Sequence, residues 1–233
     1  MGFTWGTYDT NVLKVLQSSQ IMSVAWKELN AKRCNCKALP DYPGYKAGKL
    51  DDEKLVREIW DVLDKADVVI AHYGDGFDLK KLNARFAYYG LNAPSAYKSI
   101  DTKKVSKKYF IFDNNKLDSL GSYFKLGNKV QTTGFSLWVD CMAGSPEAWS
   151  LMKKYNKVDV ELLEKVYLKL RPFINNHPNL NLITDKEGCS CPSCQGTSLM
   201  KRGFTITKTG RKQRYQCQDC GSWSSGKFEK STN

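Results

Sequence analysis

At 233 residues and 26.5 kDa, the chain is long enough for one sizeable core and a small appendage. No stretch approaches the roughly 20 apolar residues of a membrane span, and the N-terminus lacks the charged and apolar regions of a signal peptide. These observations exclude a membrane-spanning helix and predict a cytoplasmic protein without a membrane partner. The formal net charge of +12 favours a polyanionic partner, nucleic acid first, although an indifferent basic surface is the alternative.

The N-terminal half predicts alternating helices and strands, which is typical of α/β architecture. Ile21–Trp26 alternates as a strand does, and a helix begins at Asp51 or Asp52, one of which caps it, and runs to about Lys65. Val68–Ala71 is short and apolar, as in an interior strand. A glycine-containing loop, His72–Gly76, follows it and leads into a helix over Leu79–Tyr88.

Asp78 stands where this strand, loop and helix meet, the usual place for ligand and catalytic groups in an α/β sheet. The other interpretation of Asp78 is a helix N-cap, and this segment alone leaves both interpretations open. Ser99–Thr102 predicts a further strand end. There Asp101 is interpreted as the cap of a helix over Thr102–Tyr109 in preference to a metal ligand. The following lysines are either a solvated helix face or a phosphate track: Lys103, Lys104, Lys107 and Lys108.

The second half predicts two more helices. Asn114–Leu126 ends at a glycine, and Asn128–Val139 is predicted as a loop. Ser145, Pro146 and Glu147 begin a long helix that runs to about Arg171. Tyr155 and Asp159 lie four residues apart on one face of that helix. The same face is mostly apolar, where an acid is costly unless it is paired or binds a metal.

HYGDGFD around Asp78 and YNKVD around Asp159 resemble the second and third motifs of the DEDD 3′–5′ exonucleases, in the ribonuclease H-like superfamily. The similarity is greatest to the YprB-like ribonuclease H-like group and covers much of residues 5–170. It implies a mixed sheet flanked by helices and hydrolysis of phosphodiester bonds with Mg²⁺ or Mn²⁺. The resemblance implies that Asp78 and Asp159 are metal ligands. It also implies that Tyr155 orients or helps to deprotonate the attacking water, and that His72 lies at the edge of the site.

The first motif of that family, Asp-x-Glu on the central strand, is absent from this chain. Asp9 is the only early acid, and WGTYDTNVL resembles the family sequence just after that strand. Three interpretations follow: a truncated start of an active nuclease, a copy whose missing strand comes from a second chain, or a catalytically silent binder. A sheet without this strand would expose unpaired backbone groups.

The eight cysteines are better interpreted as thiols or metal ligands than as disulfides. Two CxxC pairs, Cys191/Cys194 and Cys217/Cys220, have the spacing of a tetrahedral Zn²⁺ site, with Cys189 as a spare thiol. A hairpin turning at Thr209-Gly210 is predicted between the pairs. The whole resembles a structural zinc ribbon of DNA-associated proteins. Its predicted contacts to DNA or RNA are Lys201, Arg202, Arg211, Lys212, Arg214 and Tyr215.

The sequence therefore predicts a ribonuclease H-like domain over residues 1–174, a linker over 175–188 and a zinc ribbon over 189–233. His177, in the polar linker, is predicted to be solvated. The predicted function is metal-dependent, 3′–5′ exonuclease-like hydrolysis, in a complete or an incomplete version. The alternative is a non-catalytic accessory protein that binds DNA or RNA through the ribbon, or a ribbon that serves only as a structural or protein-docking module.

Overall fold

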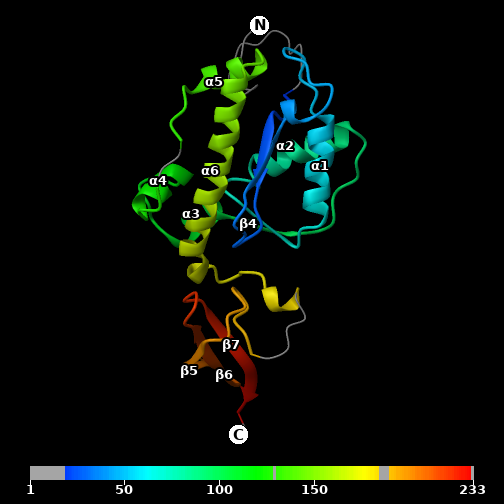
Figure 1. The fold of residues 1–233 in the computed structure, drawn as a ribbon. Coiled ribbons are helices and arrows are strands. Elements are labelled where there is room, and N and C mark those ends of the chain that lie inside the picture. Colours follow the sequence, from blue (N-terminus) through cyan, green and yellow to red (C-terminus); the bar gives the residue numbers. More distant parts are fainter. Residues whose placement is uncertain (1–18, 128–129, 184–188, 232–233) are drawn as a thin grey trace, which may run out of the picture.

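The computed structural model describes residues 19–127, 130–183 and 189–231. It shows an α/β part followed by a small β unit at the C-terminal end (Figure 1). The helices are α1 (Glu53–Asp64), α2 (Asp78–Tyr88), α3 (Thr102–Tyr109), α4 (Leu117–Tyr123), α5 (Phe135–Met142) and α6 (Pro146–Leu170). The strands are β1 (Ser23–Trp26), β2 (Asn35–Ala38), β3 (Val68–Ala71), β4 (Lys98–Asp101), β5 (Leu199–Thr207), β6 (Gly210–Cys217) and β7 (Trp223–Lys230).

The strands of the α/β part form two separate ladders. β1 pairs antiparallel with β2, and β3 pairs parallel with β4. Within the described residues no strand joins these ladders, so each is a sheet of two strands. The predicted absence of a central strand stays a prediction, since residues 1–18 are not among the described residues. Asp9 and the rest of WGTYDTNVL lie outside the described residues.

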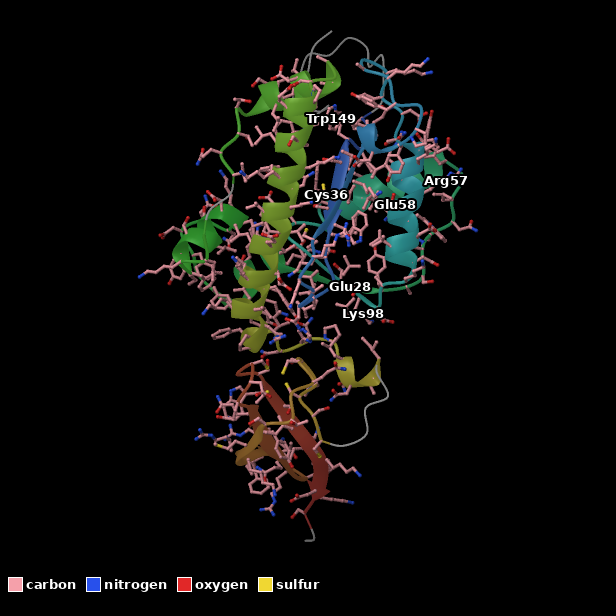
Figure 2. The ribbon with its side chains drawn as sticks, in the orientation of Figure 1. Glu28, Cys36, Arg57, Glu58, Lys98 and Trp149 are labelled. Carbon is pink, nitrogen blue, oxygen red and sulfur yellow. The ribbon has the colours of Figure 1, made fainter. Side chains whose placement is uncertain are left out.

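The long helix α6 connects two hydrophobic cores. Its first half contributes Trp149 and Met152 to a cluster that also contains residues of α1, α2 and α5. Its second half contributes Leu162 and Val166 to a cluster with residues of β4, α3 and α4. Figure 1 shows α6 running along the β1–β2 hairpin, with α1 on the other side of that hairpin. Figure 2 labels Trp149 near the beginning of α6.

The beginning of α6 confirms the predicted start signal. The Ser145 hydroxyl accepts a hydrogen bond from the Ala148 backbone N–H at 3.2 Å, and Pro146 is the first helical residue. The predicted loop over Asn128–Val139 was wrong for its last residues, because α5 begins at Phe135. Burial of Leu137 and Cys141 in the first core stabilises this short helix, an effect that local sequence does not reveal.

Asp52 precedes α1, as predicted, but its side chain does not cap the helix. It is fully buried and pairs with Arg85 of α2, whose guanidinium donates to both carboxylate oxygens, at 2.5 and 3.0 Å. The Tyr89 hydroxyl and the Ile21 backbone N–H donate to the same carboxylate, at 2.6 and 2.8 Å. Of the two predicted caps, Asp51 accepts a hydrogen bond from the Glu53 N–H at 3.1 Å. The Asp52 alternative was wrong, because this buried charge is paired with a fixed cation.

The predicted linker is ordered around its middle. The His177 ring hydrogen-bonds with the Tyr167 hydroxyl at 2.7 Å and packs against the Tyr167 ring, so the prediction of a solvated side chain was wrong. Further on, the Leu180 N–H donates to the Pro192 carbonyl at 2.8 Å, and the Gln195 side chain donates to the Leu180 carbonyl at 2.9 Å. These two hydrogen bonds hold the segment that begins at Leu180 against the loop of the first cysteine pair.

Candidate functional site

Asp78 lies at the carboxyl end of β3 and is the first residue of α2, with Phe77 at the N-cap position. Phe77 offers no side-chain cap to α2, and the Asp78 carboxylate interacts with the N–H of its own backbone, whereas Asp101 caps α3 through its side chain. The neighbouring strand, β4, ends in Asp101. The parallel register pairs Asp101 with Ala71, the last residue of β3, so the two strands end at the same level. Two acids thus lie at the same edge of a parallel ladder, where ligands commonly bind in α/β sheets.

Asp101 fixes the loop that leads to Asp78. One of its carboxylate oxygens accepts backbone hydrogen bonds from Tyr73 at 2.9 Å, Lys103 at 3.0 Å and Lys104 at 3.3 Å. Tyr73 has a φ of 66°, which a non-glycine residue adopts only when its surroundings hold it there. The predicted cap of α3 is confirmed, and the same side chain also anchors the loop, which the sequence did not reveal.

The electrostatics of this edge favour a cation. Burial raises the pKa of Asp78, the N–H of its own backbone lowers it, and the nearby Asp101 raises it further. Asp101 is 3% exposed, and its second carboxylate oxygen has no hydrogen-bond partner among the described residues. The buried Asp101 and the solvent-accessible Asp78 repel each other when both are ionised, and a divalent cation with oxygen ligands would relieve that repulsion.

Replacing Asp78 by asparagine should raise the thermal midpoint of the metal-free chain at pH 7. The folded pKa is above the unfolded one, so the ionised carboxylate destabilises the fold once the pH exceeds the folded pKa. The gain should shrink as the pH falls below the raised folded pKa and should vanish below 3.8, where the carboxyl is protonated in both states. Calorimetry at several pH values checks this, with the exposed Asp61→Asn as control. An equal gain from both variants would contradict the assignment.

His72 and Tyr155 occupy different environments. One ring nitrogen of His72 hydrogen-bonds with the Thr102 hydroxyl at 2.9 Å and the other with the Asn115 carbonyl at 3.0 Å. These contacts suit a residue that fixes the loop between β3 and α2. Tyr155, on α6, packs against the first core, and its ring meets that of Trp138 at 6.5 Å between centroids.

Asp159 lies one turn beyond Tyr155, half-buried, between the segments of α6 that enter the two cores. Asp78 and Asp159 have the oxygen donors that Mg²⁺ and Mn²⁺ prefer. Within residues 19–127, 130–183 and 189–231, however, no three carboxylate or histidine side chains come close enough to share an ion. The described residues alone do not form a complete carboxylate site.

The four cysteines of the C-terminal unit do form such a group. Their sulfurs all lie within 4.8 Å of one another, with Cys191 to Cys220 at 3.7 Å and Cys194 to Cys217 at 3.6 Å. Ligands about 2.3 Å from a tetrahedral Zn²⁺ lie about 3.8 Å apart, so the geometry fits this ion. Burial raises the pKa of Cys191 and Cys194, so a cation is needed to hold them as thiolates. Cys189 stands outside the cluster and is exposed.

The predicted nucleic-acid contacts divide between two faces of the β5–β6–β7 sheet. The predicted hairpin over Met200–Gln216 is confirmed as β5 and β6, and a third strand, β7, was not predicted. Side chains alternate along a strand. Lys212 and Arg214 therefore share one face, while Arg211 and Tyr215 lie on the other with Lys201, which is opposite Tyr215. Arg202 lies in an irregular stretch of β5.

A groove of about 450 Å³, lined by three lysines and by Asp75 and Asp101, lies where the α/β part meets the linker. Lys98, Lys104 and Lys108 line it together with Asn176 and Pro178. Figure 2 shows Lys98 at the end of the α/β part that is nearest the C-terminal unit. Of these lysines, Lys104 is paired with Asp75 at 2.7 Å. Of the four lysines of the predicted phosphate track, Lys104 and Lys108 line this groove, and the track stays a prediction.

Comparison with known proteins identifies the α/β part. A family model described as the RNase H superfamily matches residues 34–171, more than half of the chain. A search of curated proteins finds no match. Across the described residues, the helices are all too short or too polar to cross a membrane.

Proposed function

Because the chain belongs to the RNase H superfamily, we propose that it processes nucleic acid by metal-dependent hydrolysis of phosphodiester bonds, in the manner of a 3′–5′ exonuclease. One arrangement carries the proposal: Asp78, solvent-accessible at the start of α2, has its pKa raised by partial desolvation and by the nearby Asp101, which is buried at the end of β4. Such an arrangement is unfavourable in the empty fold and favourable around a cation.

The residues divide into ligands and supports. Asp78 and Asp159 are the proposed ligands of Mg²⁺ or Mn²⁺, with further carboxylates supplied from outside the described residues, in this chain or from a second chain. Tyr155 is the proposed partner of the attacking water. His72 and Asp101 hold the loop that carries Asp78, through the contacts to Thr102, Asn115 and Tyr73. When bound, the ions would polarise the phosphodiester and activate water.

Nucleotide release from end-labelled single-stranded DNA and RNA, in the presence of Mn²⁺, tests this function. The wild-type chain is expected to release nucleotides from the 3′ end. Asp78→Asn and Asp159→Asn should each reduce the rate by about 100-fold or more, since the loss of a metal ligand removes about 2.7 kcal/mol or more of transition-state stabilisation. Asp61→Asn, on the exposed side of α1, is the matched control and should retain full activity. Equal rates in all four proteins would contradict the site.

A second candidate function is non-catalytic binding of DNA or RNA through the C-terminal unit. It is favoured by the contrast between the two sites: the described residues complete the cysteine cluster but not the carboxylate cluster. This function predicts that the wild-type chain releases no nucleotide. It also predicts that binding survives the loss of Asp78 and Asp159, and that binding falls when residues 189–233 are removed.

A further inference from the structure

One face of the β5–β6–β7 sheet collects exposed aromatic and cationic side chains. The register places Trp223 opposite Gln216, Ser225 opposite Arg214, and Phe228 opposite Lys212. Directly paired residues point to the same side of a sheet. We call this side the Trp223 face, and its members are Met200, Thr205, Thr207, Gly210, Lys212, Arg214, Gln216, Trp223, Ser225, Phe228 and Lys230.

The Trp223 face carries cations without acids. Asp219 and Glu229 are the acids among the described residues 189–231. Glu229 pairs with Arg211 on the opposite face at 2.9 Å, and Asp219 lies in the turn before β7. Arg211 also lies over the Phe204 ring, with its guanidinium carbon 4.1 Å from the centroid. The cations of the opposite face are thus partly neutralised within the sheet, whereas Lys212 and Arg214 face solvent beside aromatic rings that remain exposed.

A surface pocket lies next to Trp223. It measures about 290 Å³ and is lined by Thr205, Arg214, Trp223, Ser224 and Ser225. The Trp223 ring is 51% exposed, and the Arg214 guanidinium carbon lies 5.7 Å from its centroid. A flat ring, a planar cation and hydroxyl groups around one hollow are the parts that hold an unpaired base and its phosphate.

The backbone of β5 makes room for Arg214. Gly203 has a φ of 66° and stands in the irregular stretch between Lys201 and Phe204. A Cβ built on Gly203 would lie 3.4 Å from a guanidinium nitrogen of Arg214. The irregularity therefore brings the β5 backbone close to the arginine side chain and limits where that side chain can move.

From these observations we propose that the Trp223 face is a binding site for single-stranded nucleic acid. A base stacks on Trp223, while Lys212 and Arg214 bind the phosphates on either side. Stacking requires a base whose ring face is free, so a blunt duplex, with its bases stacked on each other, cannot occupy the site in this way. The inference rests on the proposed function and specifies the strandedness of its substrate.

Binding of fluorescein-labelled oligo(dT) and oligo(U) to the full zinc-loaded chain tests the proposal, with a blunt duplex of equal length as comparison. Trp223→Ala should weaken single-strand binding by about 5- to 100-fold, the range found for the loss of one stacked base. Trp223→Phe keeps a ring and should recover most of the affinity. Arg214→Ala should weaken binding and reduce its salt dependence. Arg211→Ala, on the opposite face, is the matched control for a lost cation and should have the smallest effect.

Three outcomes would overturn the proposal. Equal losses from Trp223→Ala and Arg211→Ala would mean that the sheet binds by charge alone, without a preferred face. Equal losses for single strand and duplex would exclude stacking. Unchanged affinity of Trp223→Ala for single-stranded nucleic acid, at wild-type zinc content, would show that the Trp223 face does not bind nucleic acid and would favour a protein partner for it. Single-strand binding without nucleotide release would refute the proposed hydrolysis and leave this inference standing. Nucleotide release together with unchanged binding by Trp223→Ala would refute this inference and leave the proposed hydrolysis standing.

Discussion

Removal of the metal from the four-cysteine cluster is expected to unfold residues 189–231 and to leave the α/β part folded. The reason is that this unit has no apolar core of its own. Its buried described residues are two of the cysteines, Cys191 and Cys217, and two serines, Ser193 and Ser222. Neither hydrophobic cluster includes a residue beyond Ile174. Structural Zn²⁺ contributes about 10–16 kcal/mol in small domains, more than any other interaction available to this sheet.

Cys194→Ser is the variant that tests this expectation, and Cys189→Ser is its matched control. Both replace a thiol near the same turn, but only Cys194 belongs to the cluster. Cys194→Ser should lose stoichiometric zinc, and trypsin should then cleave β5 and β6 at their lysines and arginines while the α/β part persists. Cys189→Ser should keep one zinc per chain and resist cleavage. Full zinc occupancy in Cys194→Ser would show that another residue can complete the site.

Arg85→Ala is expected to destabilise the α/β part by about 3–5 kcal/mol, because it leaves the fully buried Asp52 without its cation. For a chain of this size the thermal midpoint should fall by roughly 6–20 °C. The Ile21 N–H and the Tyr89 hydroxyl would still donate to Asp52, but neutral donors do not compensate a desolvated charge. Urea unfolding followed by circular dichroism measures the loss.

Arg57→Ala provides the comparison. Arg57 pairs with Glu53 one turn away at 2.7 Å, but both side chains are about half exposed. Figure 2 shows Arg57 on the side of α1 that faces away from α6. Exposed pairs of this kind contribute about 0–1 kcal/mol. Similar losses from the two variants would mean that the Asp52–Arg85 pair is not buried in solution.

The sequence predicts best where the signal is local. Ser145 and Pro146 mark the start of α6 by cap chemistry. The two cysteine pairs indicate a metal site by spacing alone, and the apolar run at Val68 predicts β3. Each of these depends on residues a few positions apart, so tertiary structure was not needed to recognise them.

The features that sequence analysis missed depend on residues far apart in the chain. Asp52 is adjacent to a helix start, which made a cap the simplest interpretation, yet its partner lies 33 residues away. Asp101 was recognised as a cap, but its bond to Tyr73 comes from the pairing of β3 and β4. Trp223 gains its neighbours only through the register between β6 and β7. The hydrophobic periodicity of a sequence shows which side of a helix or strand is buried. It does not show which side chains from distant parts of the chain contact that side.

The hydrogen bonds between Leu180 and the loop of the first cysteine pair shorten the segment that connects the two parts of the chain. Although 18 residues separate Leu170 from Cys189, the length of chain between the last contact with α6 and the first contact with the cysteine unit is shorter, because His177 is bonded to Tyr167 and Leu180 to Pro192. A short tether sets a high effective concentration, in the millimolar range for flexible linkers. A nucleic-acid strand held by the C-terminal unit would therefore meet the α/β part by an intramolecular step. Long substrates would gain avidity, and oligonucleotides too short to span both parts would not.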